Sequence, residues 1–495
     1  MKRTAVINVV GLAGALIGEH TPRIRDFASG RAMVPVLPAF PAVTCTAQSN
    51  FLTGRTPSAH GIVGNGWYHR ELAEVQFWKQ SDHLVAGRKL WEELREEDQK
   101  FTCAKLFWWF NMYSSADYSI TPRPMYPADG RKVFDIYTQP YSIRSEIKKD
   151  LGEFPFPSFW GPAAGVDSPQ GKADAVSRWI AGSARWVETR FQPTLSLIYI
   201  PHLDYNLQRH GTYSNPVGGR AQRGPTAGRE LNPTILPDLR AIDGIVGDLI
   251  DFFAARGVQV VLLSEYGITN VDRPVHLNRL FREQGWLAVK EELGLEILDC
   301  GASKAFAVAD HQVAHIYIND NSVATRVRSL LENTNGVASV LDAQAKSAAG
   351  IDHDRAGDLI AVAQENAWFS YYYWMEDRLA PDFARTVDIH RKPGYDPVEL
   401  FLDPAIPLVK LKIAWRLLQK RLGFRMLMDV IPLDASLVRG SHGCRPANVS
   451  DYPVLISPPQ GLRPGAAIQS TEVYEILKQS ITGTQQRICL GNSAA

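Results

Sequence analysis

LRAIDGIVGDLIDFFAARGVQVVLLSEYG, residues 239–267, contains two apolar patterns in succession. In the first part, apolar residues recur at intervals of three and four, which places them on one face of an α-helix. Gly257 follows, and glycine is a residue at which helices commonly end. The remaining run, 257–267, is short, apolar and rich in β-branched residues, as in a strand buried on both faces. The segment therefore predicts a helix that leads directly into a buried strand.

Two other runs have the character of this strand. They are TAVINVVGL at 4–12 and TLSLIYIP at 194–201. The order strand, helix, strand along the chain is typical of α/β proteins, in which such crossovers connect parallel strands. We therefore expect an α/β fold with a mostly parallel central sheet flanked by helices.

Polar side chains follow each of the three predicted strands. Asn8 lies near the end of the first, His202 and Asp204 follow the second, and Glu265 and Tyr266 follow the third. Ligands of open α/β sheets bind at the carboxyl ends of the strands. We therefore expect these side chains to converge, although they are far apart in the sequence.

The composition is that of a globular protein with a sizeable core: 45% of the 495 residues are hydrophobic and 21% are charged. We predict a core of residues 1–350 and 436–495, with residues 351–435 as a cap or insertion. The net charge of +1 gives no general attraction to nucleic acid. No nucleic-acid polymer is expected as a partner.

The predicted insertion contains the aromatic segment WFSYYYW at 368–374 and the basic amphipathic helix LVKLKIAWRLLQKRLGF at 408–424. Such a helix either packs on the sheet with its lysines and arginines exposed, which is the commoner case, or binds a membrane surface. A third segment, residues 213–233, is rich in Gly, Pro and Arg. It predicts a long loop that could cover the site.

A cytoplasmic location is the expectation from the N-terminal segment, the lengths of the apolar runs and the cysteines. The apolar run within residues 1–20 is interrupted by polar and glycine residues and lacks a clear cleavage site, so a buried strand is preferred to a signal peptide. No run of about 18 apolar residues is present to span a bilayer. The five cysteines are scattered, which favours free thiols in a reducing compartment.

A candidate nucleophile lies in PAVTCTAQSNFLTGRTPSAHGIVGNGW, residues 41–67. Thr44 either caps a helix or is a nucleophile at the helix N-terminus, where a phosphate group also binds well. Near the end of the chain, RGSHGCRP at 439–446 presents His442 between small residues. Asp204, Glu265 and His442, helped by Asn8, form an oxygen and nitrogen ligand set suited to Zn, Mn or Fe.

The order of these motifs resembles the nucleotide pyrophosphatase/phosphodiesterase branch of the alkaline phosphatase superfamily. Thr44 is followed by Thr53-Gly54, Pro57 and His60-Gly61, and then come Asp204, SEYG at 264–267 and GSHG at 440–443. The resemblance covers about 1–350 and 436–460 and implies an alkaline-phosphatase-like fold.

The resemblance also implies a metal-dependent hydrolase of phosphodiester or diphosphate bonds in small molecules. Its nucleophile would be Thr44, through a phosphothreonine intermediate, with the backbone N–H of Cys45 helping to hold the phosphoryl oxygens. The aromatic segment 368–374 would select the organic part of the substrate. Zinc is the first choice of divalent metal, with manganese or iron as alternatives, at one or two ions per chain.

The chain departs from the family pattern at several metal-ligand positions. Asn8 stands where the family has Asp, and Glu265-Tyr266 stands for Asp-His. The position four after Asp204 is Gln208 instead of His, while His210 follows two residues later, and the choice between them stays open. The predicted metal ligands are Asn8, Thr44, Asp204, Glu265, His442 and His210.

These departures make the metal site formed by Asn8, Thr44 and Glu265-Tyr266 less anionic, so that a second metal ion would bind there more weakly. They also leave alternative functions open. The chain is then a phosphonate or sulfate-ester hydrolase or a phospho-group transferase of the same fold, or a non-hydrolytic binding protein with a degraded metal site. His311 and His315, four apart on a predicted strand, either line the cleft or belong to the core. Arg391 and Lys392 either clamp a phosphate or form an exposed basic turn.

Overall fold

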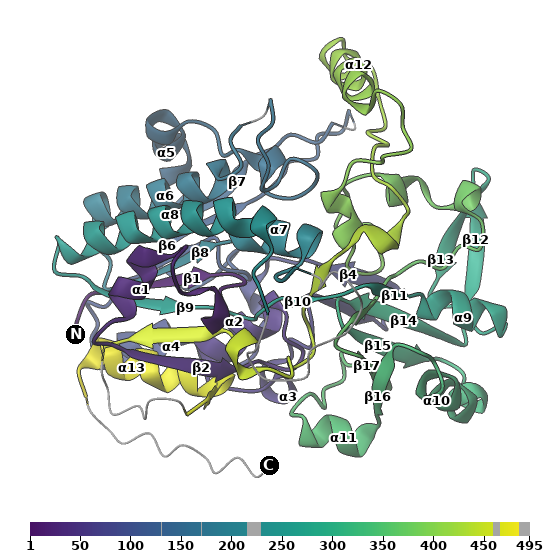
Figure 1. The fold of residues 1–495 in the computed structure, drawn as a ribbon, viewed down its shortest axis with the longest axis horizontal. Coiled ribbons are helices and arrows are strands. Elements are labelled where there is room, and N and C mark those ends of the chain that lie inside the picture. Colours follow the sequence, from purple (N-terminus) through teal and green to yellow (C-terminus); the bar gives the residue numbers. More distant parts are fainter. Residues whose placement is uncertain (130, 170, 215–228, 459–465, 485–495) are drawn as a thin grey trace.

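The computed structural model describes residues 1–129, 131–169, 171–214, 229–458 and 466–484. Its centre is a nine-stranded sheet with the order β21-β2-β20-β9-β1-β8-β5-β6-β7 (Figure 1). Most of the predicted loop at 213–233 lies outside the described residues.

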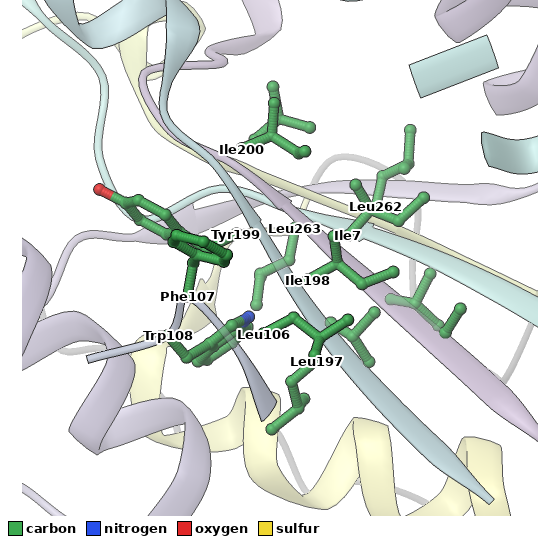
Figure 2. Close-up of a cluster of buried hydrophobic side chains, with 14 of the residues drawn as sticks. Ile7, Leu106, Phe107, Trp108, Leu197, Ile198, Tyr199, Ile200, Leu262 and Leu263 are labelled. Carbon is green, nitrogen blue, oxygen red and sulfur yellow. The ribbon is translucent and has the colours of Figure 1, made fainter. Parts of the chain in front are cut away.

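The three predicted strands form the middle of this sheet. β1 (Thr4–Val9) lies between β8 (Leu195–Ile200) and β9 (Gln259–Leu263), and both pairings are parallel. Figure 2 shows their side chains, among them Ile7 and Ile198, packed in one buried cluster. The predicted α/β fold with a mostly parallel sheet is thus confirmed.

Helices cover both faces of the sheet. α6 (Ala175–Phe191), α8 (Leu236–Ala254) and α7 (His202–His210) lie on one side, and α4 (Leu90–Glu97) and α13 (Val473–Thr482) lie on the other (Figure 1). The remaining elements of this half are α1 (Pro22–Ala28), β2 (Ala32–Leu37), α2 (Thr44–Thr53), α3 (Pro57–His60), β5 (Cys103–Leu106), β6 (Tyr118–Pro122), β7 (Ile136–Gln139), α5 (Ile143–Leu151), β20 (Val454–Ser457) and β21 (Ile468–Gln469).

A second, four-stranded antiparallel sheet has its own hydrophobic cluster. Its order is β14 (Ala305–Asp310), β15 (Val313–Ile318), β17 (Leu359–Ala363) and β16 (Val337–Leu341). The predicted boundary at residue 350 therefore falls between two strands of one sheet. Around it lie β3 (Gly66–His69), β4 (Glu74–Phe77), β10 (Thr269–Asn270), β11 (Arg273–Val275), α9 (Leu277–Glu283), β12 (Ala288–Glu292), β13 (Leu295–Asp299), α10 (Ala324–Glu332), α11 (Ala343–Ala348), β18 (Ala367–Phe369) and β19 (Gly440–Ser441).

The basic helix of the sequence is α12 (Val409–Arg421), which projects from the body of the molecule (Figure 1). None of its residues is fully buried. Within the described ranges, no helix has the length and apolar character needed to cross a bilayer.

Candidate active site

The polar strand-end residues converge as expected. Asn8 Nδ2 donates a hydrogen bond to Glu265 Oε1 over 2.6 Å, and Tyr266 donates from its hydroxyl to Asp204 Oδ1 over 3.2 Å. The physical reason is that β1, β8 and β9 run parallel, so the turns after them meet at one edge of the sheet. His202 is an exception, because its Nε2 lies 2.9 Å from Asp238 of α8.

Thr44 is the first residue of α2 and faces these strand ends. The preceding residue, Val43, has extended backbone angles, and its side chain does not cap the helix. The Thr44 Oγ1 atom lies 3.2 Å from the Tyr266 hydroxyl oxygen. The hydroxyl of Thr44 is therefore turned toward the site and not toward its own helix.

Glu265 is a buried carboxyl group surrounded by amide donors. Asn8 Nδ2 and Gln48 Nε2 both donate to its Oε1 atom, while Gln48 Oε1 accepts from the backbone N–H of Trp109. Burial raises the pKa of Glu265 to about 8, and the hydrogen bonds oppose this shift. Among the described atoms, Glu265 Oε2 and Asn8 Oδ1 are buried and have no hydrogen-bond partner.

Asp204 lies beside Gln208 on α7. Gln208 Nε2 donates to Asp204 Oδ2 over 2.8 Å, and Gln208 Oε1 accepts from the Tyr395 hydroxyl over 2.9 Å. Burial raises the pKa of Asp204 to about 7. His210 is two residues further along the helix, about 200° around its axis. The structure therefore places Gln208, and not His210, against Asp204, and it does not bring His210 into the site.

His442 approaches the same carboxyl group from the other side. Its Nδ1 atom lies 2.7 Å from the carbonyl oxygen of Ala42, an acceptor, so Nδ1 carries the proton and Nε2 has a free lone pair. That Nε2 lies 3.9 Å from Asp204 Oδ1 and is buried without a partner among the described atoms. The ring of Tyr266 stacks on the imidazole at 3.6 Å. Burial lowers the pKa of His442 well below its usual value, so the ring is neutral.

The contacts around Glu265 do not fit the metal ion that Asn8 and Glu265 would hold in a dinuclear centre. The amide N–H groups of Asn8 and Gln48 already occupy Glu265 Oε1, so that only its Oε2 atom is left to face a cation. Burial raises the pKa of Tyr266 well above its usual value, so its hydroxyl is a neutral donor. Across the described ranges, no group of three or more His, Cys, Asp and Glu side chains is arranged to hold a metal ion.

One cation, in contrast, fits between Asp204 and His442. Asp204 Oδ1 and His442 Nε2 are both lone-pair atoms, and a histidine that donates its other ring N–H to a carbonyl is the usual arrangement of a metal ligand. Asp204 and His442, which both match the family pattern, thus bring one lone pair each to the same space.

Asn65 connects the nucleophile helix to the second sheet, and the sequence reasoning missed it. Its Oδ1 accepts from the backbone N–H of Cys45 over 3.0 Å, and its Nδ2 donates to Asp310 Oδ1 over 3.1 Å. The expectation that the Cys45 N–H is free to hold a phosphoryl oxygen is therefore wrong for this structure. The sequence signal for Asn65 was its position between two glycines, which is typical of a tight turn.

Of His311 and His315, only His311 reaches the site. It lies in the turn between β14 and β15 with a positive φ of 61°, not on a strand. Its ring stacks on Tyr395 at 3.6 Å and lies 3.8 Å from that of His442. His315 lies within β15 and contacts the carbonyl oxygen of Val63, so it belongs to the core.

A small cavity of about 60 Å³ opens beside Thr44, and its walls are aromatic. The side chains of 368–374 do not line it, because the aromatic ones are buried in the second hydrophobic cluster. The expectation that this segment selects the substrate is therefore wrong. The lining residues are Thr44, Trp78, Trp109, Phe159, Trp160, Tyr199, Pro201, Asp204, Tyr205, Tyr266, His311, Ile389 and Tyr395.

The basic turn at 391–392 is not a phosphate clamp in this structure. The Lys392 ammonium group is buried between Asp396 and Glu399, at 2.7 Å from each carboxylate. Arg391 pairs with Asp382 at the surface. Both cations are thus already matched by carboxylates.

Comparison with protein families finds a match to type I phosphodiesterase/nucleotide pyrophosphatase over residues 4–396. No curated protein sequence matches the chain. Phosphonoacetate hydrolase from Sinorhizobium meliloti, solved with phosphonoformate, has a TM-score of 0.58 at 12% identity, over 97% of this chain and 96% of that chain.

Two further structures are of ectonucleotide pyrophosphatase/phosphodiesterase 5. The murine protein, an inactive threonine-to-alanine variant in complex with AMP, has a TM-score of 0.55 at 13% identity, over 98% of this chain and 96% of that chain. The human protein has the same TM-score, identity and coverage. At these identities the matches show the shared fold.

Proposed function

The chain belongs to the type I phosphodiesterase/nucleotide pyrophosphatase family of enzymes, and on that premise we propose that it hydrolyses phosphodiester or diphosphate bonds of small molecules with Thr44 as the nucleophile. The observation that carries the proposal is the Thr44 hydroxyl, which lies at a helix N-terminus and faces the strand-end residues. The murine relative that was made inactive by a threonine-to-alanine change supports the same role for a threonine.

Tyr266 positions the nucleophile in this proposal. Its hydroxyl donates to Asp204 Oδ1 and is therefore free to accept from Thr44 Oγ1. This fixes the direction of the Thr44 O–H bond and turns its lone pairs toward the cavity. The aromatic walls then take up the apolar part of the substrate and exclude water around the reacting phosphorus.

Enzymes of this family typically use divalent metals. Here Asp204 and His442 would hold a single cation. When bound, it would lower the pKa of the threonine hydroxyl and offset the charge of the phosphoryl group. The neutral Asn8 and Tyr266 leave the Glu265 side of the site to hydrogen bonding.

The test is turnover of a panel of phosphodiesters, diphosphates, phosphate monoesters, phosphonates and sulfate esters. We expect diesters or diphosphates to be the best substrates, and Thr44→Ala to lose on the order of 10³-fold or more in kcat. Thr53→Ala is the matched control, because Thr53 lies on the same helix but bonds to its own backbone at Ser49. Full activity of the Thr44 variant would contradict the proposal. So would a wild-type protein that binds compounds of the panel but turns over none of them.

The metal assignment has its own measurement. Elemental analysis of purified protein should give about one divalent ion per chain, and Asp204→Ala or His442→Ala should remove it. Glu265→Gln should change the content little, because the proposed ion lies between Asp204 and His442 and two amide donors already occupy Glu265 Oε1. An unchanged metal content in both of the first two variants would show that the ion binds elsewhere.

A further inference from the structure

The outward face of α12 and the turn after it is apolar where a surface helix is usually polar. Leu411, Trp415, Leu418 and Leu422 recur at intervals of four, three and four and so lie on one side of the helix. All four are exposed, Leu411 by 64% and Trp415 by 58%. An exposed apolar surface of this kind marks an interaction site.

The helix is held in this orientation from its opposite side. Val409 and Ile413 pack against the second hydrophobic cluster. Lys412 and Arg416 form ion pairs with Asp429, at 2.8 and 3.2 Å. The apolar stripe therefore faces away from the protein because the other face is anchored.

The same segment is strongly basic. Between Asp403 and Asp429 the chain has no acidic residue. Its cations are Lys410, Lys412, Arg416, Lys420, Arg421 and Arg425. Within the described part of the chain, only Lys412 and Arg416 of these six form ion pairs. Lys410 and Arg421 thus flank the exposed leucines without an ion pair, Lys420 lies over the ring of Phe134, and Arg425 is near enough to Asp129 to lower the pKa of that carboxyl group.

We propose that α12 and the following turn, residues 408–427, dock this protein on the surface of an anionic phospholipid bilayer. Leucine, tryptophan and phenylalanine side chains on one face, with lysines and arginines beside them, are the composition of a helix that lies in the bilayer interface. The cations without an ion pair match the negative charge of the headgroups. The helix lies on the bilayer and does not cross it, since α12 has only 13 residues.

A second copy of the chain is a poorer occupant of this surface. A symmetric contact would place the cations that flank the stripe, Lys410 and Arg421, near those of the second copy. Like charges at a desolvated interface are unfavourable, whereas an anionic surface removes this cost.

The surface adjoins the wall of the catalytic cavity. The Lys420 ammonium group lies 5.7 Å from the ring centre of Phe134, which stacks on Phe156 at 4.6 Å. Phe156 in turn lies against Phe159, which lines the cavity beside Thr44. These contacts connect the docking segment to the wall of the cavity.

The experiment is sedimentation of the full chain with vesicles of phosphatidylcholine alone and of phosphatidylcholine mixed with phosphatidylglycerol. We expect binding to the mixed vesicles only, and weaker binding at high salt. Lys410→Gln/Arg421→Gln should lower the partition coefficient about tenfold or more. Leu411→Gln/Trp415→Gln should lower it at least as much.

Two matched controls test whether the location of the change matters. Lys2→Gln/Lys100→Gln removes two exposed cations elsewhere, and Leu293→Gln removes an exposed leucine of the β12–β13 hairpin. Both should bind as the wild type does, and melting temperatures should show that every variant folds. Equal binding to both kinds of vesicle, no binding, or self-association that Leu411→Gln/Trp415→Gln abolishes would overturn the proposal.

Discussion

Tyr266 and Asn8 are the side chains that distinguish this site chemically. Tyr266 fills the space beside His442 with a stacked ring, and its hydroxyl bonds to Asp204 where an imidazole would offer a lone pair. Asn8 contributes an amide N–H to Glu265 where an aspartate would contribute a second negative charge. With Asn8 and Tyr266 in place of an aspartate and a histidine, this part of the site forms hydrogen bonds within the protein instead of attracting a cation.

This account predicts how a second metal could be restored. In Asn8→Asp/Tyr266→His, two carboxyl groups lie side by side without an amide donor from residue 8, and their repulsion favours a bound cation. We expect the metal content to rise from about one ion per chain toward two. We also expect a zinc-dependent stabilisation of about 2.7 kcal/mol at 100 times the dissociation constant.

Calorimetric titration with zinc and thermal melting with and without the metal provide the two readouts. Each single variant is a control and should bind the second ion more weakly than the double variant. Two tightly bound ions in the wild type would contradict the argument, because Asn8 and Glu265 would then be ordinary ligands.

At the scale of elements, the site depends on how closely β19 approaches α7. A Cβ atom on Gly440 of β19 would lie 2.1 Å from the carbonyl oxygen of Leu207, which is far inside contact distance. His442 lies two residues after Gly440 in the sequence, and Gln208 directly follows Leu207 on α7. The missing side chain of Gly440 therefore sets the separation of His442 and Asp204.

Gly440→Ala should accordingly lower stability by about 1–3 kcal/mol and weaken metal binding, because the two elements must move apart. Gly244→Ala is the matched control: its Cβ meets nothing within 4 Å. A helical glycine replaced by alanine should gain up to about 1 kcal/mol. Urea unfolding and elemental analysis measure both effects, and normal metal content in a stable Gly440→Ala protein would refute the role given to this contact.

At the scale of the whole molecule, the site lies between the two largest hydrophobic clusters of the described residues. Thr44 and Asp204 come from the first half, while His311 and Tyr395 come from the second. The halves are joined there by the bond from the Cys45 N–H to Asn65 Oδ1, at 3.0 Å, and by the bond from the Tyr395 hydroxyl to Gln208 Oε1, at 2.9 Å. We therefore expect the two clusters to unfold together.

Scanning calorimetry of two core variants tests this coupling. Phe306→Ala opens a cavity in the second cluster and Phe253→Ala opens one in the first, and each side chain is fully buried. Each change should lower the free energy of unfolding by about 3–5 kcal/mol and should lower the midpoint temperature of one common unfolding transition. Two transitions, with each variant shifting only its own, would show that the halves are independent.

The sequence was sufficient for the features that depend on local order along the chain. The strand, helix and strand at 194–267 have periodicities that follow from backbone geometry, and the parallel sheet follows from their succession. The same logic predicted that Asn8, Asp204 and Glu265 would meet, since parallel strands end at one edge. Thr44 at a helix N-terminus and His442 in a tight turn are equally local features.

Only the tertiary structure revealed the partners of these groups. Gln48 and Asn8 donate to Glu265 Oε1, Asn65 accepts from the Cys45 N–H, and the Lys392 ammonium group pairs with buried carboxylates. Nothing in the neighbouring sequence indicates these contacts. The aromatic residues of 368–374 turned inward, while the leucines of α12 turned outward. Burial and hydrogen bonding between distant segments depend on how whole elements pack, and a local pattern of residue types contains no information about that packing.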